Sequence, residues 1–139
     1  MRRGLLLCVA ALMAVNGLAM LVWPQIWYQI MPTVPYTGPF NGHFVRDIGC
    51  AYLTSAGAMA WYALDPARAR PAALTGIAFL LAHAGVHVWD TLAGRCSPQH
   101  LVEDFAGVVA LPLLALALVV TRSQARPQLP IQSPGASSC

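Results

Sequence analysis

Residues 4–23 read GLLLCVAALMAVNGLAMLVW, an apolar run whose only strongly polar side chain is that of Asn16. An α-helix needs about 20 apolar residues to cross the hydrocarbon core of a bilayer. Three further apolar runs follow, at about 47–64, 71–89 and 101–121. They lack the alternation of a strand, and isolated spanning strands would leave backbone groups unpaired in lipid. The sequence therefore predicts an all-α integral membrane protein, a four-helix bundle over residues 1–121.

The composition agrees with a membrane protein. Of the 139 residues, 58% are hydrophobic and only 9% are charged, which is far from the average of soluble proteins. The net charge of +3 arises from eight arginines, most of which flank the apolar runs. Their placement indicates an orientation in the bilayer and no nucleic-acid partner.

The arginines also predict which ends of the helices face the cytoplasm. Because cytoplasmic loops carry the excess of Lys and Arg, the side with six arginines is the expected inner side. The sequence thus predicts a multi-pass protein of the bacterial inner membrane with both termini in the cytoplasm. The expected inner arginines are Arg2, Arg3, Arg68, Arg70, Arg122 and Arg126, and the outer ones are Arg46 and Arg95.

The first apolar run has a competing interpretation as a signal peptide. Arg2, Arg3 and the small residues that end at Ala19 fit a leader cleaved after Ala19, which would leave three helices. We favour retention, because the run continues to Trp23 and is long enough to span the bilayer.

Prolines predict the connections between the helices. The segment 24–42 contains four prolines and is expected to form an extended outer loop. The segment 65–71 is expected to be a tight turn that places Pro71 in the first turn of the third helix. Pro112 should interrupt the fourth helix. The last segment, 122–139, is rich in Pro, Ser and Gln and is expected to be a disordered cytoplasmic tail.

Most of the titratable side chains gather at the expected outer end, and helical spacing places them on one face of each of three helices. Imidazole and carboxylate groups are ligands of zinc, copper and iron. The sequence therefore predicts an outer-side transition-metal site in which the three helices converge, with heme as a less favoured variant. The candidate ligands are His83, His87 and Asp90 on the third helix, His43 and Asp47 on the second, and His100 and Asp104 on the fourth.

A structural polar network is the alternative. Carboxylates in the first turn of a helix are favourable to its dipole, and Arg46 could pair with Asp90, Glu103 or Asp104. In that interpretation the chain is a non-catalytic subunit of a membrane complex or a homo-oligomer. Cys50 and Cys96 lie on the same expected side and could form a disulfide. Nucleotide loops, serine hydrolase elbows and zinc-protease motifs are absent from the sequence.

Two short motifs suggest a family. The stretch FVRDIGCAYL at 44–53 and the SPQH loop at 97–100, with a Pro and Arg turn between them, resemble the DoxX-like group of small bacterial membrane proteins. The resemblance implies a four-helix bundle, and DoxX itself is associated with a membrane thiosulfate:quinone oxidoreductase. The His83-x-x-x-His87-x-x-Asp90 pattern departs from that group and points to a specialised metal or redox role.

Overall fold

The computed structural model describes residues 1–121, and every regular element in this range is helical. The predicted all-α class is confirmed. The predicted tail at 122–139 lies outside the described residues. The elements in chain order are α1 (Arg2–Val22), α2 (Pro24–Ile30), the 3₁₀ helix η1 (Val34–Tyr36), α3 (Gly42–Leu64), α4 (Pro66–Leu92), α5 (Pro98–Asp104), the π-helical turn η2 (Phe105–Ala110) and α6 (Leu111–Val120).

Three helical stretches are long and apolar enough to cross a membrane. They are α1, α4 and the continuous stretch Pro98–Val120, which joins α5, η2 and α6. This indicates a membrane protein. The helix α3 is also long, at 23 residues, but it carries Arg46, Asp47, Thr54 and Ser55 and is not among the three. Spanning by α3, and with it the four-helix bundle, stays a prediction.

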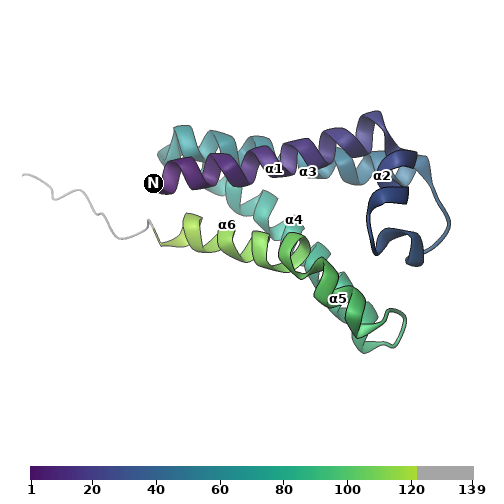
Figure 1. The fold of residues 1–139 in the computed structure, drawn as a ribbon. Coiled ribbons are helices and arrows are strands. Elements are labelled where there is room, and N and C mark those ends of the chain that lie inside the picture. Colours follow the sequence, from purple (N-terminus) through teal and green to yellow (C-terminus); the bar gives the residue numbers. More distant parts are fainter. Residues whose placement is uncertain (122–139) are drawn as a thin grey trace, which may run out of the picture.

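The closest helix contact joins α1 to α3, which lie side by side (Figure 1). Gly17 and Gly49 are both buried there. A Cβ atom added to Gly17 would lie 2.8 Å from the carbonyl oxygen of Gly49, and one added to Gly49 would lie 2.9 Å from that of Gly17. Small residues allow helix backbones to approach closely in a membrane. The contact therefore requires glycine on both helices.

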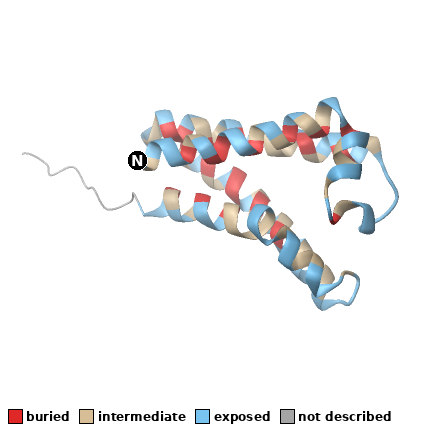
Figure 2. Cartoon of the chain, in the orientation of Figure 1, coloured by how far each residue is buried: buried red, intermediate tan, exposed pale blue. Residues whose placement is uncertain are grey.

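Side-chain hydrogen bonds connect α3 to the helices that follow it. The hydroxyl of Ser55 donates to the carbonyls of Ala51 at 2.9 Å and Gly76 at 3.3 Å, at the place where α3 meets α4. The buried hydroxyl of Tyr62 donates to the carbonyl of Val119 in α6 at 3.2 Å. Buried residues lie mostly on the facing sides of the long helices (Figure 2). The largest fully buried ones are Met13, Met59, Tyr62, Ile77 and Val119.

The helices diverge toward one end of the molecule. Figure 1 shows α4 and α5 running away from the α1 and α3 pair toward the side on which α2 lies. We call this side the α2 end. The N-terminus and the last turn of α6 lie at the opposite end, so the chain crosses the length of the molecule an even number of times.

The predicted extended loop at 24–42 is wrong, because this segment contains α2 and η1. Pro24 occupies the first turn of α2, where its missing N–H removes no hydrogen bond and its fixed φ suits a helix. Prolines therefore occupy the first turns of both α2 and η1 in this segment.

The predicted tight turn at 65–71 is also wrong, because a proline again occupies the first turn of a helix. The helix α4 begins at Pro66, and the carboxylate of Asp65 accepts the backbone N–H of Arg68 at 3.3 Å. This arrangement is a helix cap. Pro71 consequently lies inside the helix rather than in its first turn.

Pro112 lies in the first turn of α6, directly after the π-helical turn η2. A proline inside an α-helix removes one hydrogen bond and clashes with the carbonyl four residues earlier. The helix is interrupted just before Pro112, where the turn at Phe105–Ala110 widens from α-helical to π-helical.

The Gly17 and Gly49 contact predicts a sharp difference between two glycines of α3. Gly49→Ala places a methyl group 2.9 Å from a backbone oxygen, and we expect overpacking of this kind to lower the free energy of unfolding by about 1–3 kcal/mol. Gly57→Ala is the matched control, because a Cβ there meets no atom within 4 Å. Thermal unfolding in detergent measures both variants. Equal melting temperatures for the two would contradict the close contact.

Candidate functional site

Three of the predicted ligands lie together near the α2 end. His83 and His87 share one face of α4, with their ring centroids 4.9 Å apart. The Nδ1 atom of His87 lies 3.2 Å from Oδ2 of Asp104, the last residue of α5. The side chains of His87 and Asp104 are only 23% and 14% exposed. We call these three residues the His–Asp cluster.

Local helix chemistry places each member of the cluster. His83 and His87 are one turn apart on α4, so their side chains point the same way. The helix α5 begins at Pro98 and is capped by Ser97, whose hydroxyl accepts the N–H of Gln99 at 3.3 Å. Asp104 ends this short helix, just before the π-helical turn, on the side that faces α4.

A threonine outside the long helices completes the cluster. The hydroxyl of Thr33 donates to Oδ1 of Asp104 at 2.7 Å, and Thr33 is only 3% exposed. Asp104 therefore holds one partner on each of its two oxygens, Thr33 and His87. The sequence carried no signal for Thr33, because a threonine between two prolines of a loop has no periodicity and no motif.

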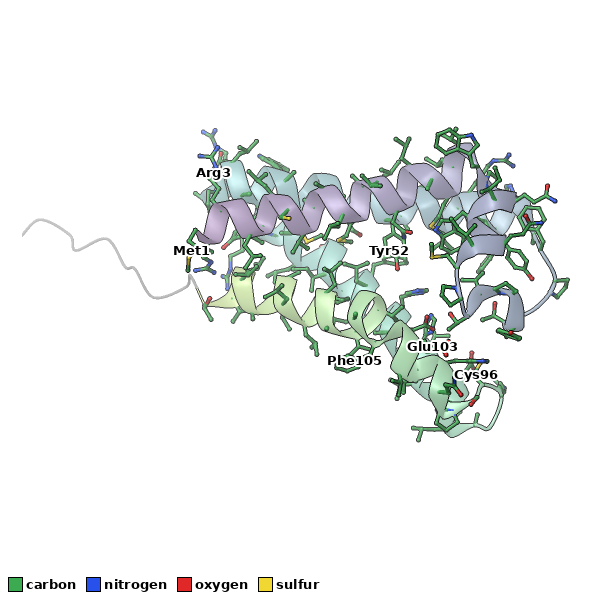
Figure 3. All side chains as sticks on the ribbon, in the orientation of Figure 1. Met1, Arg3, Tyr52, Cys96, Glu103 and Phe105 are labelled. Carbon is green, nitrogen blue, oxygen red and sulfur yellow. The ribbon has the colours of Figure 1, made fainter. Side chains whose placement is uncertain are left out.

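Aromatic side chains surround His83. The ring of Tyr52 meets it edge-on with centroids 6.0 Å apart, and Phe79 stacks on it at 6.2 Å. Figure 3 shows Tyr52 pointing from α3 toward α4 and α5. Within residues 1–121, the imidazole of His83 and the hydroxyl of Tyr52 make no hydrogen bond. Both polar groups thus have free hydrogen-bonding capacity beside the His87 and Asp104 pair.

The other four predicted ligands have separate partners. His43 lies 3.4 Å from Asp47 on α3, with side chains 88% and 60% exposed. Asp90 pairs with Arg95 at 3.0 Å, and His100 stacks on Tyr36. In the part of the chain that the structure describes, no group of three or more His, Cys, Asp or Glu side chains is placed to hold a metal ion.

The predicted core ligands are His83, His87 and Asp90, with His43, Asp47, His100 or Asp104 completing the coordination sphere. Within the described residues, no three of these side chains are placed to hold one metal ion. Helical spacing correctly placed His83 beside His87, but α4 and α5 diverge from the α1 and α3 pair toward the α2 end. His43, Asp47, Asp90 and His100 each find a nearer neighbour instead.

The predicted contacts of Arg46 and of the cysteines also differ from the structure. Arg46 donates through Nε to the carbonyl of Leu21 at 3.3 Å, while its expected partners are taken by other residues. Asp90 binds Arg95, Asp104 contacts His87, and Glu103 accepts from Gln99 at 3.0 Å. Cys50 and Cys96 are free, so the disulfide considered from the sequence is not formed here.

Comparison with known proteins adds no relative. No family model, no curated protein and no solved structure matches this chain. The resemblance to the DoxX-like group thus stays a prediction from short motifs.

The bond from Thr33 to Asp104 predicts how firmly the loop between α2 and α3, residues 31–41, is held against α5. We expect Thr33→Val to speed local opening of the loop about tenfold, because it removes a hydrogen bond to a charged acceptor. The amides of Tyr36 and Thr37, bonded to the carbonyls of Thr33 and Val34, report the opening by hydrogen exchange. Thr37→Val is the control, since its hydroxyl bonds only to Val34 within the loop. Similar acceleration by both variants would show that Asp104 does not anchor the segment.

Proposed function

We propose that this chain is a multi-pass membrane protein in which His83 and His87 bind a transition-metal ion, copper, zinc or iron, for a redox or metal-handling role. The observation that supports this proposal is the arrangement of the His–Asp cluster. Two imidazoles lie one helical turn apart with centroids separated by 4.9 Å, and a carboxylate contacts one of them at 3.2 Å.

The carboxylate is the informative part of this arrangement. Histidines that bind a metal usually donate their other ring N–H to a carboxylate or carbonyl, which fixes the tautomer and the orientation of the ring. Asp104 contacts His87 at Nδ1, so Nε2 is the nitrogen left for a ligand. In this proposal Asp104 is a positioning residue, and Thr33 holds its second oxygen.

Two protein ligands suggest a site that exchanges its metal. Structural zinc sites have four protein ligands, whereas catalytic sites keep an open position. A metal on His83 and His87 alone would have open positions for water or for a second molecule. The ring of Tyr52 meets that of His83 edge-on, and the hydroxyl of this tyrosine is a group able to donate to such a molecule.

The position of the two histidines in an apolar helix supports a functional role for the His–Asp cluster. His83 and His87 belong to α4, one of the helices able to cross a membrane. Ionisable side chains within such helices are costly, and they commonly mark ligand or proton pathways.

A second candidate is a non-catalytic subunit of a membrane complex. It is favoured by the fact that both oxygens of Asp104 already have protein partners. The cluster would then join α4, α5 and the loop at 31–41 without any metal. Replacement of His87 would lower the stability of the protein or its assembly, with no change in metal content.

We also propose four spanning helices with both ends in the cytoplasm of a bacterial cell. The start of α1 and the end of α6 lie at the same end of the molecule (Figure 1). Arg2 and Arg3 belong to that end, and Arg68 and Arg70 lie in the first turns of α4, directly after the connection from α3. Excess arginine on one side is the expected mark of the cytoplasmic side.

The metal proposal predicts the behaviour of three variants. The full chain, purified in mild detergent and loaded with Cu(I) or Zn(II), should retain about one ion per chain by metal analysis, and His83→Ala with His87→Ala should abolish binding. Asp104→Asn should weaken binding about 10- to 100-fold, the usual effect of losing an orienting carboxylate. His43→Ala is the matched control, because it removes an exposed histidine that also faces an aspartate.

Folding is checked for each variant by circular dichroism and gel filtration. Metal binding that is equal in wild type and in the folded double variant would overturn the proposal. Absence of binding in the wild type, together with loss of stability in His87→Ala, would favour the structural subunit instead.

The topology predicts the outcome of reporter fusions. A fluorescent protein fused after the C-terminus should be bright, because it folds in the cytoplasm, and alkaline phosphatase at the same point should be inactive. Alkaline phosphatase fused within the α4 to α5 connection at 93–97 should be active. Active phosphatase at the C-terminus would contradict the proposed cytoplasmic C-terminus.

A further inference from the structure

A concave surface surrounds Arg46 at the α2 end, away from the His–Asp cluster. It has a volume of about 370 Å³ and lies between the end of α1, the start of α2 and the start of α3. Its walls are mainly apolar, from Trp23, Ile26 and Phe40, and its polar side chains are those of Gln25 and Arg46. The surface thus combines one cation with aromatic and aliphatic walls.

The guanidinium of Arg46 is fixed and available at this surface. Its Nε donates to the carbonyl of Leu21 at 3.3 Å, which holds the head group against the last turn of α1. Within the described residues it pairs with no carboxylate, whereas Arg95, the other arginine of the α2 end, binds Asp90 at 3.0 Å. The terminal nitrogens of Arg46 therefore remain able to bind an anion in the planar, forked manner of arginine.

An apolar groove adjoins this surface. The groove has a volume of about 240 Å³ and is lined by Ala19, Trp23, Ile26, Trp27 and Ile30. Trp23 and Ile26 line both concavities, so the two adjoin at these side chains. The indole of Trp27 donates to the side chain of Asn16 at 2.9 Å, which fixes one wall.

The apolar side chains of the groove face outward. Trp23, Ile26 and Ile30 are 58%, 56% and 64% exposed. Ala19 lies one turn inside α1, which is apolar enough to span a membrane. The surface therefore runs from a cation at the end of the helices to the apolar side of a helix that is able to span a membrane.

We propose that the two concavities form one binding site for an anionic phospholipid. The phosphate lies on Arg46, and one acyl chain follows Trp23 and Ile26 toward Ala19. Charge complementarity favours an anionic headgroup, and the adjoining apolar groove suits the acyl chain attached to it. This site shares no residue with the His–Asp cluster and does not depend on the proposed metal.

The test measures how much lipid the purified full chain retains. The protein in mild detergent is mixed with phosphatidylglycerol or with phosphatidylcholine of the same acyl chains, and bound lipid is counted by native mass spectrometry. We expect one tightly held phosphatidylglycerol per chain and weaker retention of phosphatidylcholine. Arg46→Gln should lower the retention of phosphatidylglycerol about tenfold, through loss of a charge-assisted hydrogen bond.

Arg95→Gln is the matched control, because it removes the same charge from the same end of the molecule. Equal losses in the two arginine variants would overturn the proposal, since only general surface charge would then matter. Equal retention of both lipids by the wild type would also overturn it.

Two further experiments distinguish binding of a phospholipid from binding of a free anion. Ile26→Asn should reduce lipid retention while Arg46 is intact, because the acyl chain loses its apolar wall. Excess inorganic phosphate should fail to displace bound phosphatidylglycerol. Full displacement by phosphate, or normal retention by a folded Ile26→Asn variant, would reduce the site to a headgroup contact and overturn its acyl-chain part.

Discussion

The backbone contact between Gly17 and Gly49 fixes the geometry on which the rest of the molecule depends. Helices in lipid gain little from burying apolar side chains against each other, so close packing decides how they associate. With α1 and α3 held together at these glycines, Tyr52 comes to lie beside Gly17 on one side and His83 on the other. Ser55, one turn further along α3, then meets α4. The contact thus places α3 so that Tyr52 borders His83 of the His–Asp cluster.

The diverging helices at the α2 end are bridged by the segment between α1 and α3. One anchor is the bond from Trp27 to Asn16 of α1, and the other is the bond from Thr33 to Asp104 of α5. The π-helical turn that follows Asp104 changes the direction of the helix just after the carboxylate. A short loop and an irregular turn therefore place a mostly covered carboxylate against His87.

Local patterns in the sequence predicted the parts of this structure that depend on neighbouring residues. Long apolar runs predicted helices, and four-residue spacing placed His83 beside His87. Contacts between helices depend on where the helices cross and how far they diverge, which spacing does not encode, so Asp104 joined the cluster while His43 and His100 did not. Proline was treated as a helix breaker, although in the first turn it is compatible with a helix, and α2 was missed for that reason.

The segment between α1 and α3 also joins the two candidate sites without mixing their chemistry. Its first half, α2, supplies Ile26 to the surface around Arg46, and its second half supplies the buried Thr33 to Asp104. Arg46 is exposed, whereas Asp104 is mostly covered, so an anion at the surface and an ion at the cluster would meet two different parts of this short stretch of backbone. The bond from Trp27 to Asn16 holds the first part of this stretch, and the bond from Thr33 to Asp104 holds the second. Each site can therefore be altered by substitution while the other keeps its contacts.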